Sequence, residues 1–415
     1  MRHARTSLFA QGTTVDFQYW IWGVWGQCVS SAPGMLTYNT FFKILVWSLK
    51  ALRAGKWPTH DWNGRRYLRG SEEYRLATTN GGWLADGYYG ELWVLQGDLD
   101  FYLKVFGLEN YNSAVAPCIF CPCNLTTLNW RDFRLTAAFV DHIYTKASWL
   151  ASHPDHIVLF DHVSILAVAA DWMHNKHLGT DQYFYGSVLW LLVYNILDQS
   201  RTAETNFDQV WATIKRMYRS LRTSSRFVTM NLKSFTNPSD PTASYPKLKG
   251  NAAMVKHLGA PLLKVFEELM DRTDRHQRML RLALEKSVQL EQILDNNTGN
   301  KLPATEAQQF MQVTSDFLLL LNSIALHYNQ TLGLNLFDIT IKCHQLLHCA
   351  LQAQYIHPRL TWNYAGEDYM KHCRRLILAC SRGTGMYDMS HKFIERYLFA
   401  LHWAFVGFDD WHLRR

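Results

Sequence analysis

The sequence predicts a helix-rich α/β protein in which strand-containing segments near the ends of the chain flank a large helical block. Two observations lead to this prediction: short aromatic and β-branched runs occur before residue 97, and helical apolar periodicity dominates residues 131–336. The chain has 415 residues, of which 48% are hydrophobic and 19% are charged. A large buried core is therefore expected, and an intrinsically disordered protein is excluded.

The N-terminal part contains two expected elements. Val15–Val29 is rich in aromatic and β-branched residues, which suits one strand or a tight strand pair. Over Tyr38–Leu52 the apolar residues recur at helical spacing, and Gly55 followed by Pro58 is expected to end that helix. A long loop is expected over residues 57–82, where Gly, Arg and Asn are frequent.

A further strand is expected at Tyr88–Gln96. This apolar run is bounded by Gly87 and Gly97 and is too short for a typical helix. Asp98 lies just past its end, and a helix over Phe101–Phe106 is expected to follow.

The helical block contains a long periodic run, Pro261–Leu294, after a polar loop at Thr236–Lys249. Its apolar stripe indicates a core-facing helix rather than a dimerisation coil, because the heptad is not kept over three or four repeats.

Charge and targeting signals set only broad limits on function. The chain has 42 Lys and Arg against 35 Asp and Glu, a net charge of +7, which permits a polyanionic partner. The N-terminus lacks the apolar run of a signal peptide and no apolar stretch is long enough to span a bilayer, so we expect a soluble intracellular protein.

The cysteines and histidines suggest a metal site. The eight cysteines are too few for a disulfide scaffold. Cys118 and Cys121 form a CxxC turn, and His344 and His348 form an HxxxH pair that a helix would place on one face, so the two halves could close a tetrahedral zinc site. The alternative is that these residues are buried core side chains. Three neighbouring cysteines could substitute as ligands: Cys123, Cys343 and Cys349.

The order of four motifs resembles the transposases of CACTA-type DNA transposons. The motifs are CxxC, the DxxH of Asp171 and His174, HxxxH, and the acidic Glu367 within AGED. The same order is similar to that in the catalytic core of the recombination-activating nuclease. Across roughly residues 40–405, the resemblance implies an RNase H-like core, split by a helical insertion, that carries two aspartates and a glutamate.

The resemblance also implies roles for individual residues. Asp98, with Asp100 as its alternative, matches the second catalytic aspartate, and Glu367 matches the catalytic glutamate, 19 positions after His348. These carboxylates would hold two Mg²⁺ or Mn²⁺ ions about 4 Å apart for DNA strand cleavage and transfer. Arg374 and Arg375 would contact DNA phosphates.

The first catalytic aspartate is where the chain departs from this family. Asp16 is the only weak candidate, and its interval to Asp98 is short, so we expect the first strand to be missing and activity to be doubtful. The expected segments are an N-terminal strand remnant (1–37), the first part of the core (38–130), the helical insertion (131–340) and the C-terminal helices that complete the core (341–415).

Two functions follow as expectations. The first is a nuclear DDE transposase acting on transposon ends and target DNA, compatible with a homodimer. The second is a non-catalytic, zinc-stabilised DNA-binding or structural protein derived from one. Local interpretations stay open beside them: Asp98 as a helix N-cap, Glu367 as an exposed first-turn glutamate, Asp171 as an N-cap and His174 as a buried helix histidine.

Overall fold

The computed structural model describes residues 29–30, 34–381, 383, 385 and 388–413. Most of the expected first strand, residues 15–28, and Asp16 with it, lie outside the described residues. The described chain is built from helices: α2 (Leu36–Ala54), α3 (Glu72–Thr78), α4 (Leu99–Phe106), α5 (Lys146–Ser152), α6 (Leu159–His162), α7 (Asp181–Leu191), α8 (Ala203–Ser220), α9 (Ala252–Leu269), α10 (Arg275–Asn296), α11 (Ala304–Leu326), α12 (Ile341–Gln352), α13 (Pro358–Thr361), α14 (Tyr364–Ser381) and α15 (Met389–Leu413).

Several shorter helical turns connect these helices. Three are π-helical: η5 (Met173–Thr180), η6 (Leu192–Ile196) and η8 (His327–Thr331). The 3-10 turns are η2 (Thr79–Gly82), η3 (Ala138–His142), η4 (Ile165–Ala167) and η7 (Leu232–Ser234).

The helix-rich prediction is confirmed, but the α/β part is not, because the described residues contain only isolated β-bridges and no sheet. The expected strand Tyr88–Gln96 makes one parallel bridge, in which the amide of Leu95 donates to the carbonyl of Ala167 at 2.7 Å. The hydroxyl of Tyr102, on α4, lies 3.0 Å from the Leu95 carbonyl oxygen. Helix α4 therefore anchors this extended segment, and no further described strand pairs with it to build an RNase H-like sheet.

The N-terminal helix forms as predicted, whereas the loop after it is not wholly irregular. Helix α2 is capped at its C-terminal end by Gly55, whose φ of 63° is in the left-handed region that glycine adopts without strain. Within the expected loop, Ser71 caps α3 by accepting a hydrogen bond from the amide of Tyr74. Acidic residues at the first two positions of α3 are a helix-start signal, so this helix could have been predicted.

The predicted run Pro261–Leu294 forms two helices rather than one. The carboxylate of Asp274 accepts a hydrogen bond from the amide of Gln277 at 2.7 Å, and this cap starts α10 after the chain leaves α9. The apolar stripe is buried at Phe266, Leu280 and Leu284, which confirms its core-facing role.

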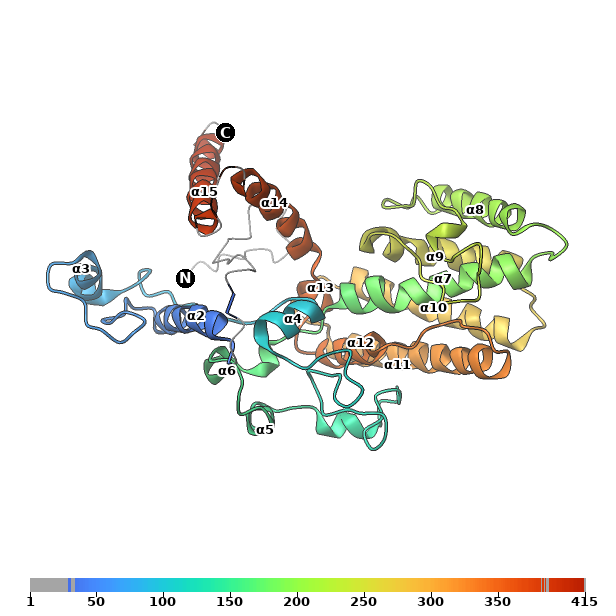
Figure 1. Ribbon diagram of the computed structural model, residues 1–415, viewed down its shortest axis with the longest axis horizontal. Coiled ribbons are helices and arrows are strands. Elements are labelled where there is room, and N and C mark those ends of the chain that lie inside the picture. Colours follow the sequence, from blue (N-terminus) through green and yellow to red (C-terminus); the bar gives the residue numbers. More distant parts are fainter. Residues whose placement is uncertain (1–28, 31–33, 382, 384, 386–387, 414–415) are drawn as a thin grey trace.

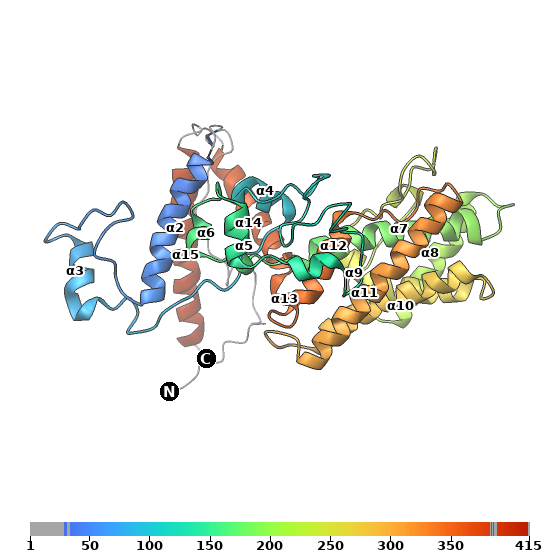
Figure 2. The ribbon, with the colours of Figure 1, turned by 90° about the horizontal axis from the view of Figure 1, so that it is seen from below.

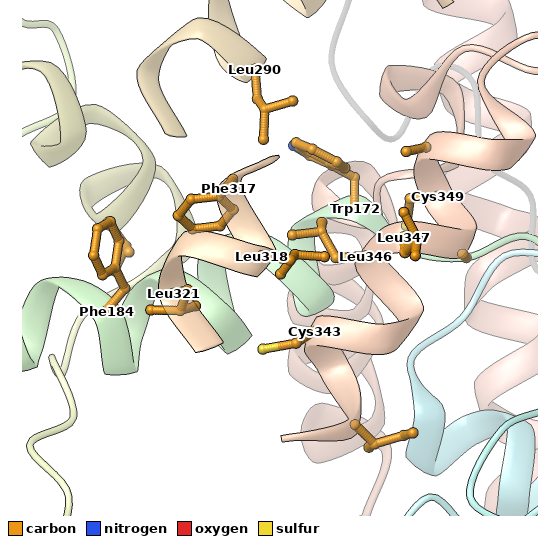
Figure 3. Close-up of a cluster of buried hydrophobic side chains, with 14 of the residues drawn as sticks. Trp172, Phe184, Leu290, Phe317, Leu318, Leu321, Cys343, Leu346, Leu347 and Cys349 are labelled. Atoms are coloured by element: carbon orange, nitrogen blue, oxygen red, sulfur yellow. The ribbon is translucent and has the colours of Figure 1, made fainter. Parts of the chain in front are cut away.

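The core lies where α9–α12 meet. Helix α10 packs against α9 and α11, and α12 packs against α11 and η5. Figure 3 shows Trp172, Leu290, Phe317, Leu318 and Leu346 converging from these elements. The stacked helices support α12 from one side, which is why its other face can be held in a fixed place.

Figures 1 and 2 show an elongated molecule. Helices α7–α11 form one end, and α2 and α3 lie at the other. Helices α14 and α15 pack against each other and stand away from α8–α11 in both views. None of the described helices combines the length and apolarity needed to cross a membrane.

Candidate metal centre

The CxxC segment forms a tight buried turn. Cys118 and Cys121 are 1% and 0% exposed, and the backbone amide of Phe120 lies 3.3 Å from the sulfur of Cys118. This turn brings the two sulfurs together, as a chelating pair requires.

The HxxxH pair lies on α12, where a spacing of four residues places both imidazoles on one face. Nδ1 of His344 lies 3.2 Å from the carbonyl oxygen of Trp130. Because a carbonyl only accepts hydrogen bonds, Nδ1 carries the proton and Nε2 keeps its lone pair for a ligand. The ring of Phe139 packs against His344, with 4.4 Å between the ring centroids.

The two halves meet although 223 positions separate Cys121 from His344. Nε2 of His344 lies 3.3 Å from the sulfur of Cys121, Nε2 of His348 lies 3.4 Å from that sulfur, and the two nitrogens lie 3.1 Å apart. The ligand atoms of all four residues, including Cys118, lie within 4.8 Å of one another.

These separations match a tetrahedral zinc site. Zn–S bonds of about 2.3 Å and Zn–N bonds of about 2.05 Å at tetrahedral angles place two nitrogens about 3.3 Å apart and a sulfur and a nitrogen about 3.6 Å apart. The observed nitrogen–nitrogen and sulfur–nitrogen distances differ from these values by about 0.2–0.3 Å. The Cys₂His₂ group is thus arranged for a metal ion rather than packed as four unrelated core residues.

The protonation states of His348 and Cys118 favour metal binding. Burial lowers the pKa of His348, which favours the neutral imidazole that a metal ligand must be. At Cys118 burial opposes ionisation, but hydrogen bonding with Cys121 outweighs it and lowers the pKa to about 6, whereas hydrogen bonding with Cys118 and Cys123 raises the pKa of Cys121. A thiolate is therefore accessible at neutral pH.

The three alternative cysteine ligands are outside the four-residue group. Cys343 and Cys349 face η5: the sulfur of Cys343 lies 3.6 Å from the hydroxyl of Thr180, and that of Cys349 lies 3.8 Å from the amide nitrogen of Asn175. Cys123 is buried near Cys118 but is outside the four-residue group.

The predicted catalytic aspartate Asp98 is the N-cap of α4. Its carboxylate accepts a hydrogen bond from the amide of Phe101 at 2.7 Å. The alternative, Asp100, forms an ion pair with Lys104 at 2.7 Å on the same helix. Both carboxylates therefore serve local helix structure here.

The DxxH motif contacts Glu367 directly. Nδ1 of His174 lies 2.5 Å from Oδ2 of Asp171, and its Nε2 lies 3.0 Å from Oε1 of Glu367. Both partners are carboxylates, so both ring nitrogens donate protons. Burial alone would lower the pKa of His174, but the hydrogen bonds to Asp171 and Glu367 raise it to about 9. His174 is therefore a partly buried cation between two anions, which the sequence did not indicate.

The carboxylates are not gathered into a magnesium site. Among the described residues, the Cys₂His₂ group is the only set of three or more His, Cys, Asp or Glu side chains placed so that it could hold a metal ion. His174 already supplies a positive charge beside Glu367, and Asp98 is occupied as a cap. Arg374 and Arg375 are exposed on α14, and no described residue forms an ion pair with either.

No family model, curated protein or solved structure matches the chain. The resemblance to CACTA-type transposases therefore stays a prediction from motif order.

Proposed function

We propose that the protein is a zinc-stabilised DNA-binding protein of transposase descent. The observation that carries the zinc part of this proposal is the Cys₂His₂ group, in which every ligand residue is at most 2% exposed, and transposase descent is inferred from the order of the motifs. A catalytic zinc ion keeps an open position for water or substrate, whereas a structural zinc ion is closed by four protein ligands. The full burial and the complete ligand set support a structural ion.

Such an ion would fasten the Cys118–Cys121 turn to α12. The turn precedes most of the helical block, and α12 follows it. Because a preformed site is absent from the unfolded chain, metal binding there contributes directly to folding stability.

Metal analysis tests the zinc assignment. The purified protein is expected to hold about one zinc ion per chain, and replacement by Co²⁺ should give the visible spectrum of a tetrahedral thiolate site. Cys118→Ser should lose the ion, and Cys343→Ser, a buried cysteine outside the group, should keep it. Folded wild-type protein that contains no metal and takes up no Co²⁺ would exclude the zinc site.

DNA binding is supported by charge and by the position of two arginines. The chain carries a net charge of +7, and Lys371, Arg374 and Arg375 are exposed near one another along α14. Such residues bind phosphates without reading sequence. A DNA partner would place the protein in the nucleus. Fluorescence anisotropy with duplex DNA at low salt tests the proposed DNA binding. If no binding is measured under these conditions, the DNA-binding part of the proposal is wrong.

Strand cleavage and transfer is the second candidate. It is favoured by one observation, that the fold brings together the DxxH motif and Glu367, two motifs of the resemblance that lie 193 positions apart in sequence; a metal ion at Glu367 would have to replace the cationic His174 as its partner. If Mg²⁺- or Mn²⁺-dependent nicking occurs, Glu367→Gln should abolish it and Glu285→Gln, an exposed change on α10, should not. Unchanged nicking in Glu367→Gln would remove Glu367 from the reaction.

A further inference from the structure

The π-helical segment η5 and the residues just before it carry an unusual set of polar side chains. Asn175, Lys176 and His177 are at most 1% exposed, and each contacts a different partner. Lys176 forms an ion pair with Asp181 at 2.7 Å, and Asn175 faces Cys349 on α12. Burying such groups costs folding free energy unless each is paired. We call Asn175, Lys176 and His177 with their partners the polar hub of the helical block.

Two histidines of this segment hold the start of α14. Nε2 of His174 contacts Oε1 of Glu367 at 3.0 Å, and Nδ1 of His177 lies 2.8 Å from the hydroxyl of Tyr364. The histidines are three positions apart in η5, and their partners are three positions apart in the first turn of α14. The two pairs thus fix both the position and the rotation of α14.

In each histidine, the ring nitrogen that does not contact α14 contacts a carboxylate. Asp171 orients His174, and Glu291 of α10 lies 2.9 Å from Nε2 of His177. Although burial opposes ionisation of Glu291, the nearby His177 and Lys176 lower its pKa. These contacts from Asp171 and Glu291 help to fix the ring orientations of the two histidines.

Asp171 is committed to this arrangement and is not available as a metal ligand. Its Oδ1 accepts hydrogen bonds from the amide of Met173 at 2.8 Å and from the amide of Asn363 at 3.2 Å, and its Oδ2 is bound to His174. The residue is 4% exposed. The carboxylate of Asp171 therefore binds both Asn363, the residue before α14, and His174, which in turn contacts Glu367.

We propose that Asp171 and His174 are positioning residues for Glu367, and that with His177 they form the joint that holds the α14–α15 hairpin on the helical block. Among the described helices, α14 packs extensively against α15 alone, and the hairpin stands apart from α8–α11 (Figures 1 and 2). Among the contacts of the described residues, the side-chain pairs at the start of α14 are those that join it to the helical block. None of the residues of the joint is a candidate zinc ligand.

Hydrogen–deuterium exchange of the full chain in its zinc-loaded form tests the joint. His174→Ala and Glu367→Ala are each expected to raise amide exchange over residues 367–372 about tenfold, as for loss of one charge-assisted contact. The double variant should exchange no faster than either single variant, because both remove the same contact. Exchange in α10 and α11 should be unchanged. His372→Ala, on the same helix but half-exposed, is the matched control.

Three results would overturn the proposal. One is additive effects of His174→Ala and Glu367→Ala, which would show separate structural roles. Another is exchange in His174→Ala that equals the His372→Ala control. The third is loss of protection throughout α10 and α11 in Glu367→Ala, a change at a partly exposed side chain that should not unfold the block. The zinc content of every variant is measured in parallel, so failure of the joint and failure of the zinc site are distinguished.

Discussion

Nε2 of His344 lies 3.3 Å from the sulfur of Cys121, although the two residues are 223 positions apart in sequence. The contact closes a loop that contains the whole helical block. Closing a loop of that length costs entropy, and a metal ion can offset this cost because it binds both halves only when the fold has brought them together.

The first prediction concerns removal of the metal. A strong chelator should lower the unfolding temperature, because an ion that binds only the folded chain stabilises it by about 4 kcal/mol at a thousandfold excess over its Kd. Thermal unfolding followed by circular dichroism, with and without chelator, measures the effect. Cys121→Ser should match the chelated wild type and should not respond to chelator. An equal unfolding temperature in all samples would contradict a structural ion.

The second prediction concerns pH and His174. The folded-state pKa of about 9 is above the ordinary value of 6.5, so the His174 contacts stabilise the fold fully below pH 6.5 and are lost as pH rises through 9. The full shift corresponds to about 3 kcal/mol, an upper value because Glu367 is partly exposed. Urea unfolding at pH 6 and pH 9.5 should show a larger loss for wild type than for His174→Gln. Equal losses would show that His174 does not contribute.

The metal ligands were accessible to sequence reasoning because each half has a local signature. CxxC and HxxxH are short motifs, and the structure brings both halves together as expected. The polar hub has no such signature, since Lys176 finds its partners in Asp181 and Glu291, and the latter lies on another helix. Pairing of that kind depends on how helices pack, which no local window contains.

The error over the sheet has a similar cause. Tyr88–Gln96 has the composition of a strand, and its backbone is extended at Leu95. A sheet, however, requires further strands to pair with it, and the described residues supply only the bridge to Val168. By contrast, Asp98 was open to two interpretations, and the structure shows the local one, a helix cap.

The third prediction concerns the buried ion pair of Lys176 and Asp181. Both side chains are at most 1% exposed, and the ammonium group also lies 2.8 Å from the hydroxyl of Ser287. Lys176→Met should destabilise the protein by about 3–5 kcal/mol, because it leaves Asp181 buried without a counter-charge.

The double variant Lys176→Met with Asp181→Leu should recover part of this loss in stability. Lys264→Met, at an exposed pair, should cost less than about 1 kcal/mol. Urea unfolding measures all three, and a small loss in Lys176→Met would show that Asp181 is neutral in the fold.

The fourth prediction concerns DNA. Arg374 and Arg375 are exposed on α14 without a described ion-pair partner, so both are free to neutralise phosphates. Replacing both with Ala should weaken duplex binding at low salt and reduce the slope of log affinity against log salt by about 2, one unit for each lost phosphate contact. Arg216→Ala, at an exposed arginine of α8 paired with Glu268, should leave the slope unchanged.

Because the joint at His174 and His177 fixes α14, His174→Ala should weaken binding without changing the slope, since it removes no phosphate contact. A double arginine variant with the wild-type slope would place the DNA surface elsewhere on the molecule.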